Sequence, residues 1–245
     1  MHQALDELQL NFQQIEELHA EKVTKGNITI DPWLRPDSED SRLGLSLIFP
    51  VGSQFKSYTS LCSHYMPFQD SLYLYPHEDL HVTLFDIFPS VVGFDIFDGQ
   101  LNQYSKVIHE LFQKIPPFQI DLKGVLFTDV GGFVKGFDCL NLHHIRKEIR
   151  EKMTAAKLPF QERYESKIAH ITFCRYKDEL THPYKLQQVN QKLREHYLDT
   201  LQITEVSLVI HDCYNLKSKT KIVASIPLGG KNKQFIVQRP IIITP

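Results

Sequence analysis

The stretch HVTLFDIF at residues 81–88 decides the fold, because it returns in altered form as KIAHITFCRY at residues 167–176. Each stretch contains a His-x-Thr triplet followed by an apolar residue. The second triplet lies about 90 residues after the first. Both stretches are otherwise apolar and have the length of a single strand, so we expect two buried β-strands of similar design.

Side chains on a strand alternate between its two faces, so residues i and i+2 point the same way. His81 and Thr83 should therefore share one face, and His170 and Thr172 should share one face of the second strand. The apolar residues between and after them should turn into the core. Two such strands side by side would place two imidazoles and two hydroxyls in one cleft.

These groups suit the displacement of a phosphodiester. Imidazole titrates near neutrality, so one histidine can take a proton while the other gives one. The hydroxyls of Thr83 and Thr172 can donate to the non-bridging oxygens of the phosphate. Two imidazoles can manage both proton transfers, and we expect no cofactor and no metal ion.

The rest of the chain predicts a mixture of strands and helices around these two stretches. Apolar runs and alternation predict strands at 43–51, 72–75, 118–127, 133–137, 202–211 and 220–228, with a turn at Gly131-Gly132. Three- and four-residue spacings predict helices at 53–65, 99–115, 139–157 and 184–198, the last one reaching Tyr197. This order favours an α+β fold with mostly antiparallel sheets.

Residues 1–20 form a candidate amphipathic helix whose stripe consists of Leu5, Leu8, Phe12, Ile15 and Leu18. We expect it to dock on its own domain, with recruitment of a partner protein as the alternative. The sequence suggests three regions: this helix with an irregular linker (1–42), a two-lobed domain (43–228) and a tail (229–245), which would add an edge strand or lack order.

Composition limits the function further. Lys and Arg total 27 against 29 Asp and Glu, a formal net charge of −2. That balance excludes a long nucleic-acid track held by bulk positive charge, although a nucleotide or an RNA end still fits a local basic pocket. No apolar run could cross a bilayer and no secretory signal begins the chain, so we expect a cytoplasmic protein without membrane contact. The cysteines are far apart and are expected to be reduced thiols: Cys62, Cys139, Cys174 and Cys213.

The paired His-x-Thr-apolar motifs resemble those of the two-histidine (2H) phosphoesterase superfamily. That group includes RNA 2′,3′-cyclic phosphodiesterases, also called 2′-5′ RNA ligases, and nucleotide cyclic phosphodiesterases. The resemblance covers residues 43–228 and implies a two-lobed, pseudo-symmetric fold in which each lobe contributes one motif strand to a central cleft. It also implies a hydrolase for an RNA end or nucleotide carrying a cyclic phosphate, with His170 as base and His81 as acid.

Two further residues complete the candidate site. The second motif, HITFCR, is similar to a HITLAR-like form of the superfamily in which an Arg follows the His by five residues, and here that residue is Arg175. Strict alternation places Arg175 on the opposite face from His170, so it reaches a phosphate only if the strand ends or bulges near Cys174. Tyr164 precedes the motif in a predicted loop, where it would stack on a base or simply face solvent.

Several alternatives compete with this interpretation. His81 and His170 could be two core histidines, or the cleft could bind a nucleotide without turnover. A metal site would draw on His77, His143 and His144, but no carboxylate or cysteine stands at ligand spacing near them. A basic group on the predicted helix at 139–157 is expected to form a solvated face of mixed charge: Arg146, Lys147 and Arg150.

Overall fold

The computed structural model describes residues 2–35, 37–138 and 142–230. In this part of the chain, nine strands form two sheets in which every recorded pairing is antiparallel. The first sheet has the order β3-β1-β8-β9 and the second has the order β2-β6-β5-β4-β7. The strands are β1 (Leu43–Pro50), β2 (Leu72–Leu74), β3 (His81–Val91), β4 (Phe118–Thr128), β5 (Gly131–Asp138), β6 (Ala169–Tyr176), β7 (Tyr197–Ile203), β8 (Glu205–His211) and β9 (Lys221–Pro227).

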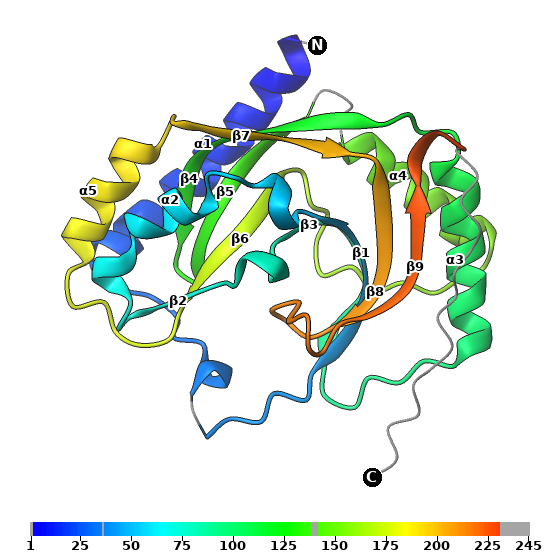
Figure 1. Cartoon of the computed structure of the whole chain (residues 1–245), viewed down its shortest axis with the longest axis horizontal. Coiled ribbons are helices and arrows are strands. Elements are labelled where there is room, and N and C mark those ends of the chain that lie inside the picture. The colour runs from blue at the N-terminus through cyan, green and yellow to red at the C-terminus, as the bar shows by residue number, and fades with distance from the viewer. Residues whose placement is uncertain (1, 36, 139–141, 231–245) are drawn as a thin grey trace.

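The helices lie on the outside of the two sheets (Figure 1). Helices α1 (His2–Thr24), α2 (Tyr58–Ser63) and α5 (Pro183–Leu193) flank the second sheet, whereas α3 (Asp98–Phe112) and α4 (Leu142–Ala155) flank the first. The two motif strands, β3 and β6, lie against each other where the sheets meet. The α+β prediction with antiparallel sheets and a two-lobed fold is therefore confirmed.

Helix α1 packs on β4 and β5 of its own chain, as expected. Its main anchor is Phe12, which is 1% exposed and contacts the rings of Phe133 and Phe137. Lys22 forms an ion pair with Asp129 in the turn between those strands, and Nδ1 of His19 lies 3.0 Å from the same carboxylate. The expected stripe is wrong at Leu18, which is 67% exposed, and the side chain of Leu5 lies outside those that the structure describes.

The segment after α5 differs from the prediction. The helix ends at Leu193, and Tyr197 begins β7, a strand absent from the expected set. The four-residue spacing from Leu193 to Tyr197 imitated a helical face, although Tyr197 is mostly exposed. The connecting turn lies directly over Gly124, where a Cβ atom would be 1.9 Å from the Arg194 carbonyl oxygen. Only glycine permits this approach, so β7 pairs with β4 for tertiary reasons that periodicity does not reveal.

Other boundaries shift less. The helix expected over 53–65 reduces to α2 between two 3₁₀ turns. The reversal between β4 and β5 falls at Asp129-Val130, and the glycine pair Gly131-Gly132 opens β5. Three of the cysteines carry free thiols, Cys62, Cys174 and Cys213, while Cys139 and residues 231–245 of the tail lie outside the described residues.

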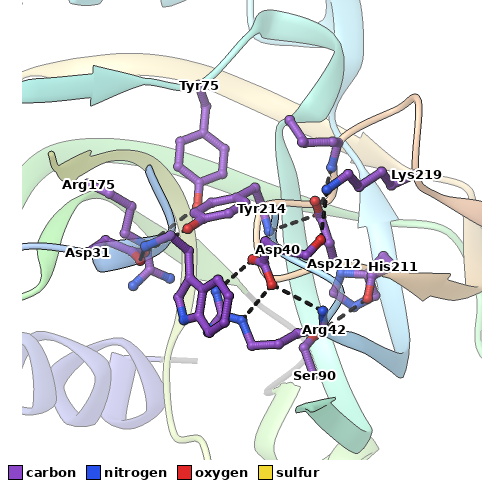
Figure 2. Close-up of polar contacts among 12 residues, drawn as sticks. Asp31, Asp40, Arg42, Tyr75, Ser90, Arg175, His211, Asp212, Tyr214 and Lys219 are labelled. Atoms are coloured by element: carbon purple, nitrogen blue, oxygen red, sulfur yellow. Dashed lines mark hydrogen bonds and ion pairs between the residues drawn. The ribbon is translucent and has the colours of Figure 1, made fainter. Parts of the chain in front are cut away.

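The linker contains one 3₁₀ turn at Pro32–Leu34, and it is fixed to the second sheet and to the loop between β8 and β9. The Asp31 amide donates to the Tyr176 carbonyl, and its carboxylate accepts from the Tyr214 hydroxyl at 2.9 Å. Arg42 forms an ion pair with Asp40 at 2.7 Å and lies over the ring of Trp33. Figure 2 shows the contacts of Asp31 with Tyr214 and of Asp40 with Arg42, beside Arg175 and His211. Among the described helices, none combines the length and the apolar character needed to span a bilayer.

Candidate active site

Strand β3 shows the alternation expected for the first motif. Val82 and Leu84 are at most 1% exposed, whereas His81 and Thr83 are half-buried on the opposite face. Burial of the apolar pair holds the strand in place, and the polar pair lines a cleft. The predicted alternation of core-facing and cleft-facing side chains on this strand is confirmed.

Strand β6 repeats the arrangement. Ile171 and Phe173 are fully buried, whereas His170 and Thr172 are half-buried and line the same cleft as the first motif. The four polar residues of the two motifs therefore meet, although they come from strands of different sheets.

Each motif strand has a β-bulge after its threonine. On β3, Thr83 pairs with Ile48 and Phe85 with Leu47, which leaves Leu84 as the extra residue. On β6, Thr172 pairs with Phe133 and Cys174 with Gly132, which leaves Phe173 extra. An extra residue shifts the alternation by one, so the fifth residue after each histidine returns to the face of the histidine.

The bulge on β6 decides the position of Arg175. Phe173 and Cys174 are both buried, and Arg175 then lines the cleft with His170 and Thr172. The sequence required a bulge near Cys174 for Arg175 to reach the cleft, and β6 has that bulge. On β3 the corresponding position is occupied by Asp86, which lines the same cleft.

The glycine pair at the start of β5 makes room for this bulge. A Cβ atom on Gly132 would be 2.6 Å from the Phe127 ring and 2.8 Å from the Cys174 sulfur. Such distances lie far inside van der Waals contact, so a side chain here would push β6 outward. The glycines predicted to form a turn instead allow close packing beside the bulge.

The ring of His81 has a defined orientation. Its Nδ1 lies 2.9 Å from the carbonyl oxygen of Asp79. A carbonyl can only accept, so Nδ1 carries a proton and Nε2 is the ring atom left to exchange one. Burial and the neighbouring His211 lower the pKa of His81 to about 4, while the carboxylates of Asp86 and Asp212 act in the opposite direction.

The charged side chains that act on His170 include two cations, whereas those that act on His81 include two carboxylates. Its ring packs on Phe133, with a centroid distance of 5.0 Å. Burial lowers the pKa of His170 to about 4, and the guanidinium groups of Arg146 and Arg175 act in the same direction. Carboxylates thus favour a proton on His81 and guanidinium groups disfavour one on His170.

Arg175 is held at the wall of the cleft by Tyr75. The Arg175 Nε donates to the Tyr75 hydroxyl at 3.4 Å, a contact visible in Figure 2. Tyr75 is 3% exposed, and burial raises its pKa to about 12, so it remains neutral. This contact leaves the two terminal nitrogens of the guanidinium available for an anion in the cleft.

Sequence reasoning missed a third histidine. His211, at the end of β8, lines the cleft, is 6% exposed and lies edge-to-face with His81 at 6.0 Å between centroids. Neither of its ring nitrogens has a hydrogen-bond partner among the described residues. No local signal marked this residue. Asp86, by contrast, could have been found, because it follows His81 at the same interval as Arg175 follows His170.

The expectation of a solvated basic face on α4 is wrong for Arg146, which is 1% exposed. Its guanidinium donates to the carbonyls of Thr83 and Leu84 on β3 and to those of Ser166 and Ile168 in the segment just before β6, at 2.7–3.3 Å. Burial lowers its pKa to about 10. Charge spacing suggested an exposed residue, but one guanidinium satisfies four carbonyl groups and joins the two motif segments.

The remaining candidates lie at the edge of the site or outside it. Tyr164 is 71% exposed at the mouth of the cleft. His77 lies in the 3₁₀ turn before β3 and stacks on Tyr58, and His143 and His144 lie on α4 without being buried. Within residues 2–35, 37–138 and 142–230, no three His, Cys, Asp or Glu side chains converge in the manner of metal ligands.

The two His-x-Thr strands, each with a bulge after its threonine, thus meet across two antiparallel sheets. The family model of the 2′-5′ RNA ligase superfamily matches residues 63–215, which include both motifs. This chain therefore belongs to the 2′-5′ RNA ligase superfamily, whose members are also known as 2H phosphoesterases.

Solved structures show the same fold at low identity. TT0787 of Thermus thermophilus is 16% identical, with a TM-score of 0.55 over 78% of this chain and 100% of that one. A crystallised phosphoesterase is 16% identical, with a TM-score of 0.51 over 82% and 100% of the two chains. ATU0111 of Agrobacterium tumefaciens strain C58 is 15% identical, with a TM-score of 0.51 over 78% and 93%. No curated protein matches the chain.

Proposed function

We propose that this protein is a metal-independent cyclic phosphodiesterase that hydrolyses a 2′,3′-cyclic phosphate on an RNA end or a nucleotide. The observation that carries the proposal is the pair of histidines on bulged strands facing one cleft, with a guanidinium beside one and carboxylates beside the other. Superfamily membership supports the reaction class.

The phosphate would bind on the side of the cleft where Arg175 and Thr172 lie. The guanidinium provides a charge-assisted contact to a non-bridging oxygen, and the hydroxyls of Thr83 and Thr172 donate to the other oxygens. All three groups lie on rigid strands, so the phosphorus atom is held in a fixed position between the two imidazoles.

Hydrolysis then needs two proton transfers. His170, kept neutral by its cationic neighbours, takes a proton from a water molecule whose oxygen attacks phosphorus. The bond between phosphorus and one ribose oxygen breaks, and His81 gives its Nε2 proton to that oxygen. The product is a phosphate monoester beside a free hydroxyl, and the proton balance returns when His170 passes its proton to solvent and His81 takes one up.

The test is a panel of nucleoside 2′,3′-cyclic phosphates, short RNAs with cyclic ends and ADP-ribose cyclic phosphate, each assayed with and without EDTA. We expect hydrolysis of at least one ribose cyclic phosphate at the same rate in EDTA. Binding without turnover would make the cleft a recognition site for nucleotides. Activity that disappears in EDTA and returns with zinc or manganese would overturn the two-histidine mechanism.

A further inference from the structure

A second hollow continues from the cleft toward α1, and we call it the α1 groove. It shares with the cleft the residues Arg163, Tyr164, Ser166, His170, Thr172 and Arg175. Its opposite wall is built from α1, with Leu18 and Ile15, and from Val130 in the turn between β4 and β5. A molecule bound at His170 can therefore extend into the groove without leaving the surface.

The walls of the α1 groove present apolar surface that packing does not use. Leu18 is 67% exposed and Val130 is 44% exposed, while Tyr164 is 71% exposed at the junction with the cleft. The side chains of Asn11 and Gln14 on α1 add amide donors and acceptors to the same groove. Apolar and aromatic faces combined with amides suit a nucleobase, which has flat faces to stack and polar edges to pair.

The charge on the rim also fits a nucleic acid. Arg163, Lys167 and Arg175 line the groove against one carboxylate, that of Glu165. This local excess of positive charge contrasts with the net charge of −2 for the whole chain. It favours a ligand with one or two phosphates near the cleft, since an extended strand would need a longer basic track.

We propose that the α1 groove binds the nucleoside adjoining the one that carries the cyclic phosphate, so that the preferred substrate is the single-stranded end of an RNA and not a mononucleotide. This inference rests on the proposed function, because the cyclic phosphate must occupy the cleft for its neighbour to reach α1. Residues 63–215, which match the family model, do not include α1, so the subsite is supplied from outside the matched region.

The experiment compares two substrates and two variants. The substrates are a nucleoside 2′,3′-cyclic phosphate and a dinucleotide with the same cyclic end. The variants are Leu18→Asp, within the groove, and Leu10→Asp, on the same helix but outside both hollows; each alters an exposed leucine and adds one negative charge. For the unmodified protein we expect kcat/KM to favour the dinucleotide by about tenfold or more, the value of one stacked base.

Leu18→Asp should abolish that preference and leave the mononucleotide rate unchanged, whereas Leu10→Asp should keep the preference. Equal rates for both substrates in the unmodified protein, or equal loss on both in Leu18→Asp, would overturn the subsite. If neither substrate is cleaved, the proposed function fails, and the groove is then judged by equilibrium binding of a dinucleotide and a mononucleotide ending in a 3′-phosphate. Tighter binding of the dinucleotide that only Leu18→Asp removes would support the subsite, and equal binding would contradict it.

Discussion

Strands β3 and β6 have the same design but differ in charge. Both carry His-x-Thr, both bury the apolar residues between and after these, and both have a bulge that brings the fifth residue after the histidine into the cleft. That residue is Asp86 on one strand and Arg175 on the other. The repeated geometry therefore places a carboxylate beside one imidazole and a guanidinium beside the other, so the charge next to each histidine differs.

The largest expected effect comes from removing one imidazole. We expect His81→Ala and His170→Ala each to lower kcat by about 10²–10⁴, with substrate binding nearly unchanged, and the double variant to be little worse than either. A substrate with an activated leaving group needs no protonation of that group, so it should restore the His81 variant alone. Restoration of only the His170 variant would exchange the two roles.

A second prediction removes the residue that joins the strands. Arg146→Met removes a hydrogen-bond donor from four carbonyl groups, so we expect the free energy of unfolding to fall by about 3 kcal/mol or more. Urea denaturation measures this, and Lys147→Met, at an exposed neighbour on α4, is the control and should change stability little. Similar losses of stability in both variants would mean that the buried guanidinium of Arg146 contributes no more to the free energy of unfolding than an exposed side chain does.

The difference between Asp86 and Arg175 predicts opposite changes in the pH profile. Because burial lowers the pKa of both histidines to about 4 in the empty cleft, kcat/KM should peak on the acid side of neutrality. Asp86 raises the pKa of His81, so Asp86→Asn should move the alkaline limb to lower pH. Arg175 lowers the pKa of His170, so Arg175→Gln should move the acid limb to higher pH.

Arg175→Gln should also raise KM by about tenfold, because it removes a cationic contact to the phosphate, whereas Asp86→Asn should leave KM nearly unchanged. The full pH dependence of kcat/KM for both variants provides the measurement. If both variants displace the same limb, the two histidines do not have separate electrostatic environments.

The smallest effects are expected at the threonines. Thr83→Val and Thr172→Val each remove one neutral donor with little change in volume, so kcat should fall by about tenfold and at most by 10²–10³. The loss should be greater for Thr83, because Arg175 remains to hold the phosphate when Thr172 is replaced. Steady-state kinetics of the two variants decide the order, and a greater loss at Thr172 would mean that Arg175 does not compensate for the missing hydroxyl.

Local sequence was sufficient for the two motif strands because alternation depends only on neighbouring residues. It predicted which side chains of His81–Leu84 and His170–Phe173 are buried, and it identified a bulge near Cys174 as the condition for Arg175. It also predicted the docking of α1 through Leu8 and Phe12.

Tertiary contacts account for what the sequence did not reveal. Periodicity joined Tyr197 to a helix, whereas the chain turns after Leu193 and the Arg194 carbonyl lies over Gly124 on a distant strand. Charge pattern placed Arg146 in solvent because its four acceptors come from two segments remote in sequence. His211 enters the site from β8, and no spacing connects it to either motif.

The guanidinium of Arg146 has a consequence for how the protein folds. It bonds to residues 62 and 63 positions before it and 20 and 22 positions after it in the chain. These hydrogen bonds need α4 to be docked on β3 and the segment before β6 to lie beside both. Closing the chain between these segments costs conformational entropy. Assembly of the cleft therefore depends on contacts between both lobes, and a fragment that contains a single lobe would lack one of the two motif strands.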